Sequence, residues 1–269
     1  MRGRLGCAPR PCRITHQVTG KPGFRLVPLT AVLAVTTKED EMNELALFAG
    51  AGGGLLGTES LGLRGICAVE LDRHRRCVLI QRQNERRLRS VFPIWDDVRS
   101  FDGRPWRGRV DVVSGGFPCQ AFSTAARGRN NAPNLWPEMR RVICEVEPDY
   151  VFAENVSPAA IEQAANDLSE MGYKAEMLSL SAKDLGADHE RGRFWLLAYT
   201  DDKSELRSHI NAEMAGLPEF RCGVWEAGPD SSRVVDGLAG RMERYEATGN
   251  GQVPIVAAAA LWSLANADR

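Results

Sequence analysis

The chain has 269 residues, of which 43% are hydrophobic and 26% charged, and its formal net charge is -1. This composition is typical of a globular protein with one large domain, and the near-zero charge excludes a protein that coats nucleic acid through a generally basic surface. Seven cysteines, an odd number without close pairs, indicate neither a disulfide framework nor a zinc site. We therefore expect a reducing, cytoplasmic setting and no metal.

The N-terminal stretch differs from the rest of the chain. Residues 1–36 contain six Lys or Arg and no acidic residue, with an apolar run at 26–35. That run is short, contains Pro28 and lacks a small-residue cleavage site after it, so it does not fit a secretory signal peptide. No run approaches the ~20 apolar residues that span a bilayer, and we expect no membrane partner. We expect residues 1–41 to be a disordered extension, or to precede a natural translation start at Met42.

The first predicted unit is a strand, a glycine turn and a helix. An apolar strand over residues 44–48 leads into the glycine-rich turn 49–54, and a helical pattern begins at Leu55. Such glycines let the backbone approach a nucleotide-like ligand, although glycine turns also serve purely structural purposes. A second strand, 65–70, ends in Glu70, about twenty residues after the first glycines, where nucleotide-binding sheets place a carboxylate for the ribose hydroxyls.

Two further strands carry candidate groups to the same edge. After an arginine-rich amphipathic helix at 73–89, which we interpret as a solvated face, a third strand is predicted to end near Asp97. This acid could equally begin a turn. A fourth strand, 110–114, leads into Gly115-Gly116-Phe117-Pro118-Cys119. A lone intracellular cysteine is often only a small buried hydrophobe, but this one follows a strand end, where ligands sit in parallel sheets.

The second half continues the alternation of helices and strands. Helices are predicted at 138–146 and 158–171, and strands at 149–156, 173–180 and 194–199. The first of these strands contains Glu154, and Arg191 and Arg193 precede the last. The acid-free loop 121–137, with Arg127 and Arg129, suits contact with phosphates, though a plain surface loop would look similar. Residues 201–245 lose periodicity, and a helix is predicted through 257–264.

These positions together suggest one crevice. Phe48, Glu70, Asp97, Cys119 and Glu154 all fall at predicted strand ends, a coincidence that core packing alone does not predict. A thiolate can attack electron-poor carbon while a nearby acid protonates the electrophile.

In this arrangement the chain resembles the DNA cytosine-5 methyltransferases, and the resemblance runs in order from about Leu45 to the C-terminal helix. Residues 48–53 are similar to the family's first motif, 116–120 to its nucleophile motif and 154–156 to its acid motif. Arg191 and Arg193 match its arginine motif, and Gly249-Asn250 with Val253-Pro254 its last motif. The implied fold class is α/β: a Rossmann-like S-adenosylmethionine methyltransferase sheet with helices on both faces and a short irregular target-recognition lobe.

The resemblance also implies a division of the chain and roles for its residues. The catalytic and cofactor-binding domain would span residues 42–200, the target-recognition region 201–245, and the C-terminal helix 246–269. Cys119 would attack carbon 6 of a cytosine flipped out of double-stranded DNA, Glu154 would protonate its N3, Arg193 would bind its carbonyl and Arg191 would support the site. The implied residues for S-adenosylmethionine, or its product S-adenosylhomocysteine, are Phe48, Gly50, Gly52, Gly53, Glu70, Leu71, Asp97, Val98, Pro118, Asn250 and Val253. A monomer is expected, paired functionally with a restriction endonuclease or acting as an orphan modification enzyme.

The sequence departs from the family pattern at several points. Ala46 stands where the first motif usually has Asp, and His189 where the arginine motif usually begins with Gln. The recognition region is short and acidic, and the basic N-terminal stretch has no family counterpart.

Three alternatives remain open. A catalytically dead homologue would bind DNA or cofactor only. A structured RNA could replace DNA as the substrate, although residues 120–123 resemble the DNA branch of the family. A nicotinamide-dependent oxidoreductase would explain the glycines and Glu70 but not Cys119 or the acid motif.

Overall fold

The computed structural model of the chain describes residues 41–118, 134–187, 192–215 and 251–267. The strands are β1 (Asn43–Leu47), β2 (Arg64–Val69), β3 (Ile94–Trp95), β4 (Val112–Gly116), β5 (Tyr150–Asn155), β6 (Lys174–Ser181) and β7 (Gly192–Tyr199). The α-helices are α2 (Gly53–Glu59), α3 (Arg73–Asn84), α4 (Trp136–Val146), α5 (Pro158–Glu170), α6 (Ser204–Met214) and α8 (Pro254–Asn266). Three 3-10 turns are η1 (Val98–Ser100), η2 (Arg104–Trp106) and η5 (Lys183–Leu185).

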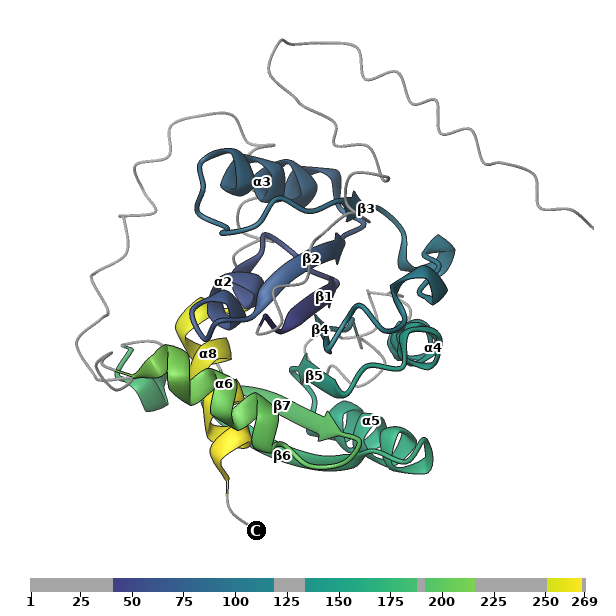
Figure 1. Ribbon diagram of the computed structural model, residues 1–269, viewed down its shortest axis with the longest axis vertical. Coiled ribbons are helices and arrows are strands. Elements are labelled where there is room, and N and C mark those ends of the chain that lie inside the picture. Colours follow the sequence, from purple (N-terminus) through teal and green to yellow (C-terminus); the bar gives the residue numbers. More distant parts are fainter. Residues whose placement is uncertain (1–40, 119–133, 188–191, 216–250, 268–269) are drawn as a thin grey trace, which may run out of the picture.

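The seven strands form one mixed sheet in the order β3-β2-β1-β4-β5-β7-β6 (Figure 1). The strands from β3 to β5 are parallel, whereas β7 runs antiparallel to both β5 and β6. The order reverses at β1, because the chain first builds outward to β3 and then returns to place β4 on the other side of β1. In parallel sheets this switch point is where ligands bind, beyond the carboxyl ends of the strands.

Helices cover both faces of the sheet, as the alternation of side chains along its strands requires. On β4, Val113 packs into the cluster that contains residues of α4 and α5, whereas Val112 packs on the side of α6 and α8. The helix α2 contacts α8, and a smaller cluster joins Leu55 of α2 and Leu79 of α3 to β1 and β2. The predicted α/β sheet with helices on both faces is therefore confirmed.

The structure corrects one expectation about the second half of the chain. Residues 201–245 were expected to lack periodicity, but residues 204–214 form α6. Leu206 and Ile210, four residues apart, are fully buried in the cluster shared with α8. The helix ends at Met214, before the first of the glycines and prolines in this region of the sequence, Gly216.

The region after β2 also differs in detail from the prediction. The arginine-rich helix ends at Asn84 instead of continuing to residue 89. The third strand has only two residues, Ile94 and Trp95, and Asp97 caps η1 rather than ending the strand. Of the two interpretations of Asp97, the beginning of a turn is the one observed.

No helix within the described ranges has both the length and the apolar character needed to cross a membrane.

Candidate active site

The glycine turn after β1 is tied to the acid at the end of β2. The backbone N–H of Gly50 donates to Oε2 of Glu70 at 2.7 Å, and the N–H of Asp72 donates to Oε1 at 2.8 Å. Glu70 is 5% exposed, yet the next residue, Leu71, is 57% exposed. The sheet edge thus presents a held carboxylate with an uncovered apolar side chain beside it.

The conformation of this turn explains its residue types. Phe48, Gly50 and Gly52 all have positive φ, at 52°, 58° and 84°. For Phe48 this region is strained, and such strain is found most often at functional sites. A Cβ at Gly50 would meet no atom within 4 Å, so the space above this residue is open, whereas a Cβ at Gly52 would lie 2.7 Å from Leu79.

Two arginines of α3 contact the backbone at this edge, Arg82 at the glycine turn and Arg76 at the end of β2. Nη1 of Arg82 donates to the carbonyl of Ala51 at 2.5 Å, and Nη1 of Arg76 donates to the carbonyls of Glu70 and Leu71 at 2.9 and 2.5 Å. The interpretation of this helix as only a solvated face is therefore wrong for these two residues. A run of arginines carries no sign of which members contact backbone, so sequence reasoning missed both.

The segment that carries the predicted nucleophile is pinned at its start. Cys119 itself lies outside the described residues, but Pro118 directly precedes it. Nδ2 of Asn155 donates to the carbonyl of Phe117 at 2.8 Å, and the N–H of Leu135 donates to the carbonyl of Pro118 at 3.1 Å. The Phe117 ring also packs against Trp136, with centroids 5.1 Å apart. The acid motif and α4 together fix where the chain enters this segment.

Glu154 and Arg193 meet at the same edge. Nε of Arg193 lies 2.7 Å from Oε1 of Glu154, and both side chains are largely buried. Glu154 is the register partner of Gly116 on β4, where a Cβ would lie 2.6 Å from Oε2 of Glu154. Gly116 therefore leaves room for the carboxylate beside the Phe117-Pro118 backbone.

Gln252 connects this acid to the glycine turn. Its Nε2 lies 3.5 Å from Oε2 of Glu154, a long contact at the limit of a hydrogen bond. A Cβ at Gly53 would collide with the Gln252 carbonyl, and one at Gly54 with its side-chain Oε1. The residue directly precedes Val253, the N-cap of α8. No signal in the sequence pointed to Gln252, because its neighbours come from three distant segments.

A buried carboxyl lies beneath the site on β1. Glu44 is fully buried and accepts hydrogen bonds from the hydroxyls of Thr58 in α2 and Ser114 in β4. Burial raises the pKa of Glu44 to about 7, and the two hydroxyls oppose this rise. Ala46, at the position where the resemblance expects Asp, is buried in the cluster with Leu55 and Leu79.

The two implied cofactor residues that follow β3, Asp97 and Val98, differ in their surroundings. Asp97 accepts from Nε and Nη2 of Arg99, and these hydrogen bonds hold the pKa of Asp97 below its usual value. Val98 is buried in the core with Phe101. Its side chain therefore faces the core, and its carbonyl accepts a hydrogen bond from Arg141 of α4.

The structure brings together most of the predicted residues that it describes. Phe48, Gly50 and Gly52 belong to the turn, Gly53 begins α2, and Glu70 is hydrogen-bonded to Gly50. Glu154 of β5 is paired with Arg193 of β7, and Pro118 follows β4. Leu71 follows Glu70, Asp97 and Val98 begin η1, and Val253 is the N-cap of α8. The predicted residues Cys119, Arg191 and Asn250 lie outside the described residues, as do His189, Arg127 and Arg129. Among the described residues, no group of three or more His, Cys, Asp or Glu could hold a metal ion.

The open space above Gly50, the held Glu70 carboxylate and the exposed Leu71 fit a nucleoside with free ribose hydroxyls. Together with the strand order, they define the class of the chain as a Rossmann-like, nucleotide-binding α/β protein.

Comparison with known proteins identifies the family. A family model described as C-5 cytosine-specific DNA methylase matches residues 42–229, more than half of the chain. The chain belongs to this family.

The chain is also similar to individual proteins. The chain is 34% identical over 176 residues to the Type II methyltransferase M.Eco47II of Escherichia coli, covering 60% of this chain and 40% of that protein. It is 30% identical over 175 residues to M.NgoMIV of Neisseria gonorrhoeae, covering 60% and 53%. A solved structure of DNMT2 from Spodoptera frugiperda aligns with a TM-score of 0.48 at 20% identity, over 61% of this chain and 51% of that one. The chain thus spans about half, or less, of the relatives it matches.

Proposed function

We propose that the chain transfers a methyl group from S-adenosylmethionine to carbon 5 of a cytosine flipped out of double-stranded DNA, through a covalent adduct with Cys119. The observation that carries this proposal is that Glu154, near the end of β5, is paired with Arg193 of β7 and is in register with Gly116, two residues before Pro118. An acid, a guanidinium and the residue that precedes a thiol thus share one edge with the glycine turn. Family membership supports the reaction, and the flipped base follows because carbon 6 is inaccessible inside a stacked duplex.

Each residue has a distinct task in this proposal. The Cys119 thiolate forms a bond to carbon 6, and Glu154 gives a proton to N3, so that the electrons of the C5–C6 double bond make carbon 5 nucleophilic. Arg193 is already aligned by Glu154 and would bind the cytosine carbonyl oxygen, with Arg191 supporting it. When bound, S-adenosylmethionine supplies the activated methyl group for carbon 5. Loss of the carbon 5 proton to a base then restores the double bond and expels the Cys119 thiolate, and N3 returns its proton to Glu154.

The cofactor is proposed to lie against the glycine turn. Glu70 would accept hydrogen bonds from the ribose hydroxyls, and Leu71 would cover one face of the adenine. The backbone at Asp97 and Val98 would border the adenine edge, while Pro118, Asn250 and Val253 would close the side nearest Cys119.

The proposed partners follow from the relatives. M.Eco47II and M.NgoMIV are described as Type II methyltransferases. We propose duplex DNA as the substrate of this chain, a monomer as the working form in the cytoplasm, and a restriction endonuclease as a functional partner. The recognition region is proposed to follow α6, within residues 216–245, since α6 packs on α8 as part of the main domain.

The decisive experiment compares the wild-type chain with Cys119→Ser. Tritiated S-adenosylmethionine should label DNA with the wild type and not with the variant, while both bind S-adenosylhomocysteine with similar Kd. Duplex DNA containing 5-fluorocytosine should trap the wild type covalently, because the fluorine cannot leave as the proton does. Retained turnover in Cys119→Ser would contradict the covalent mechanism. A wild type that binds cofactor and labels no DNA would support the catalytically dead alternative.

A further inference from the structure

The segment after β3 borders the proposed adenine site but receives little support from the sheet. The strand β3 pairs with β2 through only two residues, Ile94 and Trp95. In the last hydrogen bond of this pairing, the N–H of Glu70 donates to the carbonyl of Trp95 at 2.9 Å. Asp97 therefore lies two residues beyond Trp95, where the chain leaves Glu70, the carboxylate proposed to bind the ribose. From residue 98 to residue 106 the backbone turns through η1 and η2 without joining the sheet.

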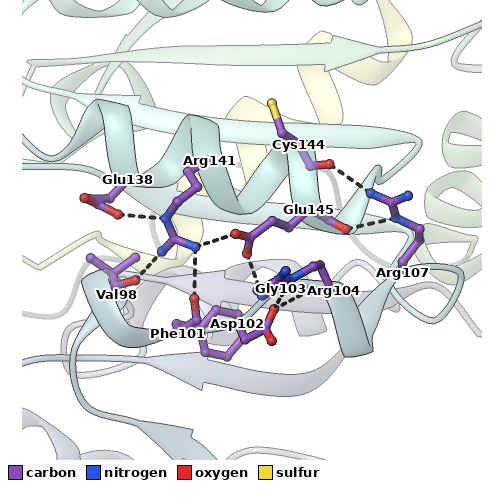
Figure 2. A network of polar contacts seen from close by, with 10 residues as sticks. All are labelled: Val98, Phe101, Asp102, Gly103, Arg104, Arg107, Glu138, Arg141, Cys144 and Glu145. Atoms are coloured by element: carbon purple, nitrogen blue, oxygen red, sulfur yellow. Dashed lines mark hydrogen bonds and ion pairs between the residues drawn. The ribbon is translucent and has the colours of Figure 1, made fainter. Parts of the chain in front are cut away.

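Arg141 of α4 contacts the backbone of this segment at two points, as Figure 2 shows. Nη2 of Arg141 donates to the carbonyl of Val98 at 2.6 Å, and Nη1 donates to the carbonyl of Phe101 at 3.0 Å. These two carbonyls lie at either end of η1. The planar guanidinium can serve both at once, a geometry that a lysine ammonium on its flexible stem does not reproduce.

Two acids of the same helix fix the guanidinium. Nε of Arg141 donates to Glu138 at 2.9 Å, and Nη1 donates to Glu145 at 2.8 Å (Figure 2). The other oxygen of Glu145 accepts from the N–H of Gly103 at 2.8 Å. Arg141 is about two thirds buried, and the acids hold it in one orientation. The helix therefore grips the segment at its start and at residue 103.

The apolar contacts alone do not set the position of the Val98 backbone. Trp95, Phe101 and Trp106 pack in sequence, with ring centroids 6.1 and 6.4 Å apart. These contacts bury side chains, but they leave the rotation of the peptide after Val98 to the hydrogen bonds of its carbonyl. Within η1 that carbonyl accepts from the N–H of Phe101 at 3.2 Å, and Arg141 supplies the bond that ties it to α4.

We propose that Arg141 is a positioning residue for the cofactor: it sets the backbone at Asp97 and Val98 against which the adenine binds, and so determines cofactor affinity without touching the cofactor. The proposal rests on the cofactor site assigned under the proposed function. Its consequence is that removing the guanidinium weakens binding of the nucleoside while leaving the chemical step, at the other side of the switch point, unchanged.

The chain provides a matched control in the neighbouring residue. Arg140 lies on the same helix and also contacts two acids, Asp167 at 3.8 Å and Glu170 at 3.9 Å, both on α5. It faces away from the cofactor segment. Arg140→Met and Arg141→Met each remove one guanidinium from adjacent positions. The first removes contacts to α5, whereas the second removes the hydrogen bonds to the Val98 and Phe101 carbonyls.

The test measures S-adenosylhomocysteine binding by calorimetry on the full chain, without DNA. Because a hydrogen bond from a charged donor is worth about 1.5–3 kcal/mol, Arg141→Met should raise Kd by about tenfold or more. Arg140→Met should change Kd less than about twofold, and Arg141→Lys should fall between them. With S-adenosylmethionine and DNA, Arg141→Met should raise KM for the cofactor and keep kcat within about twofold.

Hydrogen exchange gives an independent readout that remains usable if Arg141→Met folds poorly. In Arg141→Lys, amides of residues 98–103 should exchange faster than in the wild type, and added S-adenosylhomocysteine should protect them in both chains. Equal Kd values for wild type and Arg141→Met, or equal losses in Arg140→Met, would overturn the positioning role and leave the proposed function standing. A tenfold loss in Arg141→Met from a wild type that methylates no DNA would overturn the DNA reaction and support the positioning role.

Discussion

Arg193 and Glu154 lie on adjacent antiparallel strands, and Nε of Arg193 is 2.7 Å from Oε1 of Glu154. The pair holds the carboxylate beside the Phe117-Pro118 backbone, where the proposed proton transfer takes place.

We predict that Glu154→Gln lowers kcat for methyl transfer by about 10²–10⁴-fold, because the amide cannot supply the proton. The Kd for S-adenosylhomocysteine should change little. The control is Glu176→Gln, which disrupts another largely buried pair, with Lys203 at 2.6 Å, remote from the site. That variant should lower stability and keep kcat. Comparable losses of kcat in both variants would indicate a general structural effect.

Gln252 should assist the same carboxylate. Replacing it with Met keeps the backbone carbonyl beside Gly53 but removes the amide near Glu154, and we expect kcat to fall about three- to tenfold.

Gly54→Ala should have a similar effect, because the added methyl collides with the Gln252 amide. In a double mutant with Gln252→Ala, Gly54→Ala should cost little more, and additive losses would contradict the contact. Gln83→Met, at a buried glutamine that donates to the Phe92 carbonyl, serves as the control with unchanged kcat.

Glu44 should make stability depend on pH. Its pKa is about 7 in the folded chain and 4.5 as the ordinary value, so the folded state binds the proton more tightly. The resulting stabilisation is complete below about pH 4.5 and is lost as pH rises to about 7, and the difference corresponds to about 3 kcal/mol. Glu44→Gln cannot titrate and should lack this component.

The measurement is urea unfolding of both chains between about pH 5 and pH 8. Burial also raises the pKa values of Glu59 and Asp111, but both residues are present in both chains. The difference between the two free energies of unfolding therefore reports Glu44. Parallel pH dependences would show that Glu44 remains ionised when buried.

Asn155 should contribute both to the free energy of unfolding and to the rate at which the Cys119 adduct forms. Asn155→Ala leaves the buried carbonyl of Phe117 and the N–H of Ser157 without their side-chain partner, at a cost of about 1–3 kcal/mol. The released Phe117-Pro118 backbone should also slow trapping by 5-fluorocytosine DNA. The control is Asn211→Ala, at an exposed asparagine that pairs with Asn266. A normal trapping rate in Asn155→Ala would show that this bond does not position Cys119.

The sequence by itself determined the order of strands and helices and the edge at which the candidate groups meet. Apolar runs such as residues 44–48 and 149–156 fold locally as strands, and their carboxyl ends meet because parallel strands share direction. This is why Glu70, Glu154 and the Phe117-Pro118 entry to Cys119 could be assigned before any coordinates. The family resemblance, carried by short ordered motifs, agreed with the match over residues 42–229.

Only the tertiary structure decided which side chains support those groups. Arg82 holds the glycine turn, Gln252 joins Gly53 and Gly54 to Glu154, and Arg141 holds the Val98 carbonyl. The helix α6 was missed for a related reason: its two buried residues pack in a cluster with α8, which is distant in sequence. Each of these contacts joins residues distant in sequence, either through a backbone carbonyl or through close packing. Local composition and periodicity do not indicate contacts of either kind.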